Sequence, residues 1–556
     1  MIVVLNLLLV GLGLLIAYWW ANQGAFSALL HLLCVLAAGV LAFAIWEPVS
    51  VRVLSMGALS NFAWGIGLLA PFALFLFIFR MASDKLVPAN LNFPQLVNYA
   101  VGGALGLAAG LITMGILMLG GGLLQSERAF MGYQGWVRSS ANQGKPVDVK
   151  DGLWIPMHTL TARFFETLSG GSFAPETGTA SLANRQPNLD QVSMSLARDG
   201  ANAGRSRIAI APDAIDVTGF AYSPTMALPA ALGGRDAIYA VGITVRQPGY
   251  DQGVQFRLSA SQVRLIGGTT ADGQKAATEH PIAWTAEIKG GGSGLFPFDD
   301  TSHYITSVPG QQEMTAWMLF PAKEFGSPEQ GRPPRFIQVK GLRIALPAIE
   351  MSDAASVMAK LMGQGGSTTV PTFDPELKSL SAGDLEATNS LKPLRLSTNQ
   401  IPGMKESEGY LIEGRGSFSR SNNFRISKGL EVKGILQPED TRVVRLNISR
   451  GKSPVNIWDS KFREEAGDTA SLLLVDAGGR AFAPFGYIHD RRNDGEVDVV
   501  LEPIKGISKI SEFPSLSSAG VDDLYALYRV SVGSTIKAVR LGDIQIANAD
   551  LLITEK

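Results

Sequence analysis

Residues 1–46 read MIVVLNLLLVGLGLLIAYWWANQGAFSALLHLLCVLAAGVLAFAIW, a run without a single Asp, Glu, Lys or Arg. Two more uncharged runs follow at 53–79 and 86–126. A helix needs ~20 apolar residues to cross the hydrocarbon core of a bilayer, so the first run is long enough for two helices. The sequence therefore predicts four transmembrane helices, near residues 2–20, 25–46, 61–80 and 99–123. A signal peptide fits the first span poorly, because no basic residue precedes it.

The charges divide the chain into two parts. Its 556 residues include 48 Lys and Arg and 49 Asp and Glu, for a net charge of −1, and only five of these residues lie before residue 127. We expect a membrane domain at 1–125, with the lipid bilayer as its partner, and a water-soluble body beyond it. A net charge near zero provides no basic field, so nucleic acid is not an expected partner. The single cysteine excludes a disulfide scaffold.

The fourth predicted span carries glycines at four-residue spacing, Gly102, Gly106 and Gly110, with Gly103 beside them. Glycines four apart leave a flat helix face that another backbone can approach closely. This face predicts helix packing, either within the chain or between chains in a homo-oligomer. Among the polar residues inside the spans, His31 in the second span is the only candidate for a buried ionisable group. Such a residue in a membrane is a candidate polar site. The alternative is a structural contact with a neighbouring helix.

Two segments of the membrane domain resemble the CvpA family, the colicin V production membrane proteins of bacteria. The first is LIAYWWANQGAFSALL (residues 15–30), a family-like turn between two spans, and the second is VNYAVGGALGLAAG (residues 97–110), which carries the glycines. The family's first turn usually contains arginines, and an Asp-Arg pair usually precedes its glycines. This chain has neither feature, since Val97 and Asn98 replace the pair. The resemblance implies a location in the bacterial inner membrane more than a mechanism.

A neck is expected at 126–205. Leu153, Met157, Leu160, Phe164 and Leu168 recur at helical spacing and predict an amphipathic helix at 153–169. This helix fits two positions, on the membrane surface or packed on the body. Residues 170–205 are rich in Gly, Ser, Ala, Asn and Pro and have the composition of a linker.

The body is predicted to be all-β. Short alternating segments such as 237–245 and 314–320 indicate a first β-sandwich at 206–350, and segments such as 441–448 and 524–530 indicate a second at 406–556. A linker at 351–405 joins the two. The ending YRVSVGSTIKAVRLG (residues 528–542) is similar to the last hairpin of immunoglobulin-like bacterial surface domains, so we expect two immunoglobulin-like modules. An aromatic strand followed by a strand with a basic residue and glycine occurs in both halves, which suggests a duplication.

Motifs that carry chemistry are missing. The chain contains no phosphate-binding Gly-x-x-x-x-Gly-Lys-[Ser/Thr], no His-Glu-x-x-His and no Gly-x-Ser-x-Gly nucleophile turn. We expect no enzymatic activity and no cofactor. Two clusters have the residue types of a cation site, Asp299, Asp300 and His303, and His489, Asp490, Asp494 and Glu496. Solvated loops explain both more simply, and residues 490–496 are predicted to form a charged hairpin tip.

Two functions compete on this evidence. In the first, the chain is an inner-membrane protein whose extracytoplasmic β-sandwich modules bind envelope proteins or cell-wall components. In the second, the four helices oligomerise into a pore or transport component that the body gates or adapts. Lysines and arginines at the span ends do not decide the orientation. In the CvpA family, the arginines imply that the turn between the first two spans is cytoplasmic. With four spans, the body lies on the opposite side from this turn, so the resemblance favours a periplasmic body.

Overall fold

The structure is a computed structural model of the whole chain, and its description here covers most residues. The described residues are 1–57, 59–87, 91, 93–124, 129–139, 146–149, 152–170, 181–194, 209–228, 235–250, 256–269, 275–287, 293–298, 304–307, 313–329, 331–352, 356–357, 373–391, 403–407, 409–419, 433–437, 441–455, 457–458, 464, 466–467, 469–477, 480–516, 521–542 and 544–554.

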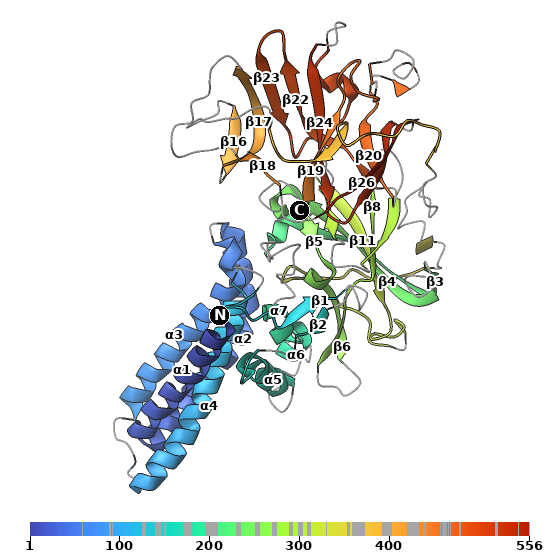
Figure 1. Ribbon diagram of the computed structural model, residues 1–556. Coiled ribbons are helices and arrows are strands. Elements are labelled where there is room, and N and C mark those ends of the chain that lie inside the picture. Colours follow the sequence, from blue (N-terminus) through green and yellow to red (C-terminus); the bar gives the residue numbers. More distant parts are fainter. Residues whose placement is uncertain are drawn as a thin grey trace.

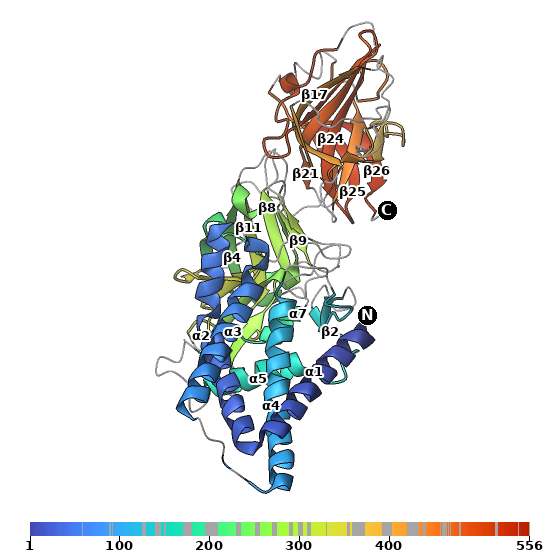
Figure 2. The same cartoon turned by 90° about the vertical axis from the view of Figure 1, so that its left-hand side faces the viewer.

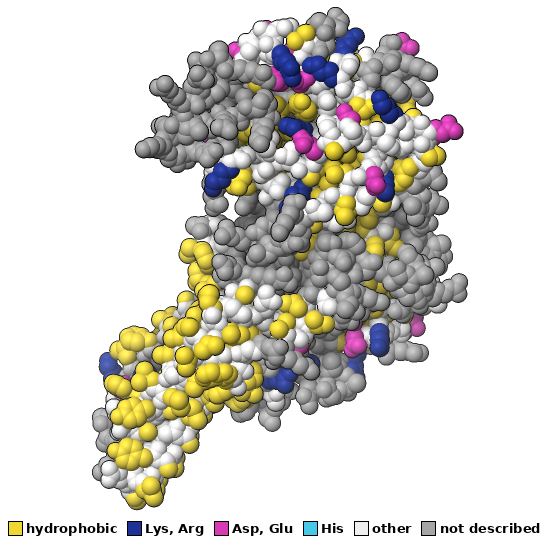
Figure 3. Space-filling view, in the orientation of Figure 1, with side chains coloured by type: hydrophobic (Ala, Val, Ile, Leu, Met, Phe, Trp, Pro, Cys, Tyr) yellow, Lys and Arg dark blue, Asp and Glu magenta, His cyan; other side chains and the backbone are white. Residues whose placement is uncertain are grey.

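The chain begins with four long helices, and each is long and apolar enough to cross a membrane. They are α1 (Ile2–Gln23), α2 (Ala25–Met56), α3 (Ala63–Leu86) and α4 (Gln95–Gly122), with the short 3-10 helix η1 (Ser60–Phe62) before α3. This confirms four helices of membrane-spanning length and composition at the predicted positions. On the face seen in Figure 3, hydrophobic side chains cover much of these helices, whereas most of the charged side chains lie over the β-rich body. We call α1–α4 the helix bundle.

The neck is more structured than the sequence suggests. It contains the strand pair β1 (Trp136–Arg138) and β2 (Pro146–Asp148) and the helices α5 (Met157–Gly170), α6 (Leu182–Arg185) and α7 (Leu189–Met194). The predicted helix at 153–169 begins later, at Met157, because Pro156 fits only at a helix start. The linker assignment for 170–205 is corrected for α6 and α7, because Ala183 of α6 and Leu189 and Met194 of α7 are buried.

The structure places α5 against the helix bundle. A side chain added at Gly115 of α4 would strike Thr161, and one at Gly39 of α2 would strike Phe165, so α5 packs directly on the helix bundle. Its other face exposes Leu160 and Phe164, at 53% and 40% of their surface. An apolar strip beside apolar transmembrane helices is typical of a helix that lies in the membrane interface.

The first β unit (residues 215–351) contains two main sheets. One has the strand order β14-β3-β4-β11-β8-β9 and the other β13-β12-β6-β7, with β5 and β10 forming a separate pair. The bounds are β3 (Ile215–Ala227), β4 (Arg235–Arg246), β5 (Arg257–Leu258), β6 (Val263–Thr269), β7 (Ala276–Glu279), β8 (Ala283–Glu287), β9 (Ser293–Pro297), β10 (Ile305–Thr306), β11 (Glu313–Pro321), β12 (Phe336–Val339), β13 (Leu342–Ala345) and β14 (Glu350–Met351), with 3-10 turns η4 (Pro212–Ala214), η6 (Gln247–Gly249) and η7 (Ala260–Gln262). Both main sheets contribute to one core.

The second β unit (residues 385–552) also packs two sheets around one core. The larger has the order β15-β19-β24-β22-β23-β17-β16, with β18 paired to β17, and the smaller has β21-β20-β25-β26. The bounds are β15 (Leu385–Ala387), β16 (Met404–Ser407), β17 (Tyr410–Ser419), β18 (Gly434–Ile435), β19 (Thr441–Asn447), β20 (Leu472–Asp476), β21 (Ala481–Phe482), β22 (Pro484–Arg491), β23 (Glu496–Leu501), β24 (Asp523–Ser531), β25 (Thr535–Leu541) and β26 (Ile544–Leu552), with η8 (Ile510–Glu512). The linker assigned to 351–405 is corrected at β15, which pairs with β19.

The two β units place corresponding strands alike. β11 and β24 lie in the larger sheet of their unit, while β12 and β25 lie in the smaller one. Each of the latter leads into a hairpin through a glycine with positive φ, Gly341 at 83° and Gly542 at 59°. The arrangement agrees with a duplication, which stays a prediction.

The first β unit shares a hydrophobic core with the helix bundle. A single cluster of buried side chains runs from Trp46 on α2 and Trp64 on α3 into Ile337 and Val339 of β12. The second β unit lies beyond the first, at the end of the molecule away from the helix bundle (Figures 1 and 2). The body is therefore docked on the helices rather than suspended from them.

Candidate functional site

The contact between helix bundle and first β unit centres on the turn of the β12–β13 hairpin. Lys340 and Gly341 both have positive φ, 45° and 83°, as in the type I′ turns that suit two-residue hairpins. The turn packs on Trp64, whose ring meets Trp46 edge-on at 5.7 Å. Trp46 donates its indole N–H to the backbone oxygen of Trp64 over 2.8 Å. We call these residues, with Glu47 and Arg343, the junction.

A buried ion pair completes the junction. Arg343 on β13 donates from Nε and Nη2 to the two carboxylate oxygens of Glu47 on α2, over 2.8 and 2.7 Å. The two side chains are only 11% and 16% exposed. Planar two-point pairing of this kind fixes orientation as well as adding charge attraction. It holds the hairpin against α2.

Substitution of Gly341 by Ala should destabilise the protein by about 2–4 kcal/mol, because the new Cβ both occupies a positive-φ site and crowds a packed ring. That Cβ would lie 2.6 Å from Trp64 Nε1. Gly451→Ala is the matched control, since Gly451 has φ of 70° and nothing within 4 Å of its Cβ position. Thermal unfolding in detergent should show the larger loss for Gly341→Ala. Equal losses would mean that the turn does not rest on Trp64.

A second polar chain ties the neck to the first β unit. Arg264 of β6 donates to Gln338 of β12 over 2.6 Å and to the backbone oxygen of Pro187 over 2.8 Å. Gln338 in turn donates to the side-chain oxygen of Gln186 over 2.8 Å. Burial lowers the pKa of Arg264 to about 10, although Glu166 and Asp190 oppose this shift. The carboxylates of Glu166 on α5 and Asp190 on α7 therefore stabilise the positive charge of Arg264.

His158 on α5 is a buried titratable group, only 1% exposed. Its Nε2 lies 3.4 Å from the Tyr133 hydroxyl and 3.3 Å from Thr159 Oγ1. Burial lowers the pKa of His158 to about 4 from an ordinary 6.5. The folded protein therefore keeps this imidazole neutral at pH values where the unfolded chain protonates it.

The free energy of unfolding should consequently fall as the pH drops from 6.5 toward 4. Between these values the unfolded state binds a proton at residue 158 that the folded state excludes, a difference on the order of 3 kcal/mol when complete. His158→Gln removes this contribution, so unfolding curves of the variant in detergent should depend less on pH over this window. Identical slopes for both proteins would show that His158 is not buried as a neutral group.

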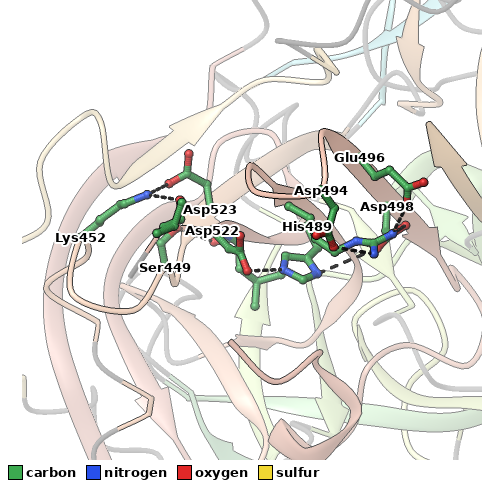
Figure 4. A network of polar contacts seen from close by, with 11 residues as sticks. Ser449, Lys452, His489, Asp494, Glu496, Asp498, Asp522 and Asp523 are labelled. Carbon is green, nitrogen blue, oxygen red and sulfur yellow. Dashed lines mark hydrogen bonds and ion pairs between the residues drawn. The ribbon is translucent and has the colours of Figure 1, made fainter. Parts of the chain in front are cut away.

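The second β unit carries a network of charged side chains at one end (Figure 4). His489 on β22 lies 3.7 Å from Asp522 and 4.0 Å from Asp498. Arg491 pairs with Asp498 at 2.9 Å. The remaining ion pairs join Arg491 to Asp494 and Glu496, and join Asp523 to Lys452 and Arg492. Carboxylates outnumber cations here, so the network is acidic overall.

This network lies at the end of the body that points away from the helices. β24 begins at Asp523, inside the network, and ends at Ser531, which lies 3.2 Å from Thr306 of the first β unit. β24 contains nine residues, so its two ends lie roughly 27 Å apart. We call the charged end the distal pole. The β22–β23 hairpin of the distal pole confirms the predicted hairpin at 490–496.

The glycines of α4 face α1 of the same chain. A Cβ at Gly106 would lie 2.9 Å from Trp20 Cβ, and one at Gly110 would lie 2.8 Å from the backbone oxygen of Gly13. Gly102 similarly approaches the backbone at Trp20 and Ala21. Gly103 lies at the edge of this face, where a Cβ would make an ordinary 3.7 Å contact with Ala21. The helix-packing face is thus used within the chain.

His31 makes a contact between helices. Its ring stacks on Trp20 of α1, with centroids 4.2 Å apart. The guanidinium of Arg80 on α3 lies 4.8 Å from the same Trp20 ring. Three spans thus meet at one aromatic cluster, at the end of the bundle away from the body.

Neither proposed cation cluster is assembled by the described residues. Asp299, Asp300 and His303 lie outside them. His489, Asp490, Asp494 and Glu496 belong to the distal pole, but within the described ranges no three His, Cys, Asp or Glu side chains converge as a metal site. The carboxylates there face arginine and lysine instead.

The junction residues were not identified from the sequence. Glu47 interrupts an otherwise uncharged stretch, and a carboxylate in such surroundings requires a partner, but nothing indicates that the partner is Arg343, 296 residues later. Asn6 of α1 is a similar case. Its side chain donates to the Gly152 backbone oxygen over 2.5 Å and accepts from the Trp154 amide over 2.8 Å.

No family model, curated protein or solved structure matches this chain. The resemblances to CvpA proteins and to immunoglobulin-like domains accordingly stay predictions.

Proposed function

We propose that the chain is a multi-pass membrane scaffold whose β body presents the distal pole to partners in the cell envelope. The observation that supports this most is the docking of the body. Trp46, Trp64 and the Glu47–Arg343 pair fix the first β unit on the helices. The second β unit, which we take to be a β-sandwich of immunoglobulin-like type, then holds its charged end at a set distance from the bilayer.

The chemistry of the distal pole suggests the kind of partner. Asp494 is 59% exposed at the tip of the β22–β23 hairpin, and Arg492 is 53% exposed beside it. The acidic excess favours a basic surface on an envelope protein or cell-wall component, because complementary charge steers association. An exposed surface whose side chains already bond to one another loses little entropy on binding.

We place the body on the extracytoplasmic side of a bacterial inner membrane. The CvpA-like segments support this location. The alternative function, a pore formed through the α4 glycines, has less support because α1 of the same chain covers them.

Photo-crosslinking in intact cells tests the proposal. A photoreactive amino acid replaces Asp494 in one full-length protein and Asp550, which is 80% exposed on β26, in another. We expect a discrete adduct from position 494 only, and its yield should fall with added salt because the charges are exposed. Adducts from neither position, or equally from both, would contradict a binding role for the distal pole. Ion flux through liposomes containing the full chain would instead favour the pore.

A further inference from the structure

A cavity of about 560 Å³ lies between α2, α5 and α6, where the helix bundle meets the neck. Its apolar wall comes from Leu36, Val40 and Phe43 on α2 and from Phe164 and Leu168 on α5. Val40 and Phe164 are 43% and 40% exposed, so the cavity opens on the outer surface of the helices. The volume is within the range of roughly 300–1,000 Å³ that small-molecule sites occupy.

The height of the cavity places it inside one leaflet. Leu36 and Glu47 lie 12 and 23 residues beyond Gly24, which is ~18 and ~35 Å along α2. A hydrocarbon core is ~30 Å thick, so a bilayer that begins near Gly24 ends close to Glu47. The apolar wall then faces acyl chains. The inner end of the cavity, which is the end lined by Glu47, lies at headgroup level.

Polar groups without partners lie at that inner end. Gln186 is 1% exposed, and its side-chain oxygen accepts from Gln338, which orients the amide. The Gln186 Nε2 donor is left buried without a hydrogen-bond partner. A buried unpaired donor costs about 1–3 kcal/mol, so such a group in a cavity wall indicates a missing acceptor.

Arg185 supplies a positive charge at the same end. It is half-buried and lines the cavity, and among the described residues its guanidinium has no ion-pair partner. Glu47, which also lines the cavity, is already neutralised by Arg343. The local charge available to a ligand is therefore that of Arg185.

We propose that this cavity holds an acyl chain of an anionic phospholipid, with the phosphate and ester oxygens of the lipid accepting from Arg185 and Gln186 Nε2. The apolar wall, its opening toward the bilayer and the unpaired donors at headgroup level all match an amphiphile that enters sideways from the membrane. A free phosphate would satisfy the donors but leave the apolar wall empty. The site is independent of the distal pole, so either proposal can fail alone.

A photoactivatable phospholipid tests the site in the full-length protein. The protein is placed in phosphatidylcholine vesicles that contain a small share of phosphatidylglycerol with a diazirine on one acyl chain, then irradiated and mapped by mass spectrometry. We expect adducts concentrated on 36–44 of α2 and 164–168 of α5. Inorganic phosphate should not compete. Adducts spread evenly over the outer surface of the four helices would show annular lipid only and overturn the proposal.

Three variants sharpen the result. Val40→Trp fills the mouth and should remove most of the adduct, whereas Leu41→Trp, 37% exposed on the same helix but outside the cavity, should not. Arg185→Gln should keep the adduct but lose about tenfold or more of the preference for the anionic over the zwitterionic lipid, as expected for a charge-assisted hydrogen bond. Each variant is compared only if it unfolds thermally like the unsubstituted protein. Equal labelling of Val40→Trp and Leu41→Trp, or an unchanged preference for the anionic lipid in Arg185→Gln, would overturn the proposal.

Discussion

Glu47→Gln and Arg343→Met, made singly, should each destabilise the docked body by about 3–5 kcal/mol, because each leaves the other charge buried without a partner. Both side chains are mostly covered, and the pair joins a membrane helix to a β-hairpin. The double variant Glu47→Gln, Arg343→Met should recover much of this loss. It leaves a neutral amide beside an apolar side chain, so no charge stays buried without a partner.

The control is an exposed ion pair with the same nitrogen–oxygen distance. Lys537 and Asp550 lie 2.7 Å apart with 38% and 80% of their side chains exposed. Lys537→Met should change the stability by only about 0–1 kcal/mol, as exposed ion pairs do. Thermal unfolding of the four variants in detergent gives the comparison. If Arg343→Met were as mild as Lys537→Met, the first β unit would not be docked on α2.

Gly110→Val should have the second large effect, a loss of about 2–4 kcal/mol in the stability of the helix bundle. Its Cβ would lie 2.8 Å from the Gly13 backbone oxygen, and backbone cannot rotate away as a side chain can. α1 would have to separate from α4. Gly103→Ala is the control, because its Cβ would make only an ordinary contact, and we expect a change within about 0.5 kcal/mol.

A cysteine pair determines whether this glycine face is used within one chain. With Cys34 replaced by Ala, we combine Ala21→Cys with Gly103→Cys, positions whose Cβ atoms would lie 3.7 Å apart. A disulfide needs a Cβ separation of about 3.5–4.5 Å. Oxidation in membranes should give a disulfide-bonded monomer. A disulfide-linked dimer would mean that α4 packs on another copy of the chain.

The arrangement of charge and glycine made the helix bundle predictable. The absence of charge in three long runs is a direct consequence of lipid solvation, and the four helices follow it closely. The glycine spacing of α4 predicted a packing face because close backbone approach requires glycine. Which helix covers the face could not be predicted, since sequence spacing does not specify a neighbour.

The junction depends on contacts between distant residues, and these leave little local signal. The Lys340–Gly341 turn resembles any hairpin turn until Trp64 is placed against it. The short helices α6 and α7 have linker-like composition, but Ala183 of α6 and Leu189 and Met194 of α7 are buried against their neighbours. Tertiary packing overrides weak local preference in such segments.

The unpaired donor of the α2–α5–α6 cavity was equally inaccessible from sequence. Gln186 follows a short polar stretch, and an exposed glutamine there would need no explanation. Its burial at 1% and the orientation imposed by Gln338 are what leave the donor unsatisfied. Such a site emerges only from the relation between three helices and a sheet.

Labelling from each side of the membrane tests the whole arrangement most directly. In a Cys34→Ala background, Lys85→Cys marks the end of the bundle away from the body, and Arg450→Cys marks the second β unit, both exposed. A membrane-impermeant maleimide should reach position 450 when added to intact spheroplasts, and position 85 only when added to inverted vesicles, whose cytoplasmic face is turned outward. Labelling of both positions from the same side would contradict a bundle that crosses the bilayer with its body docked at one end.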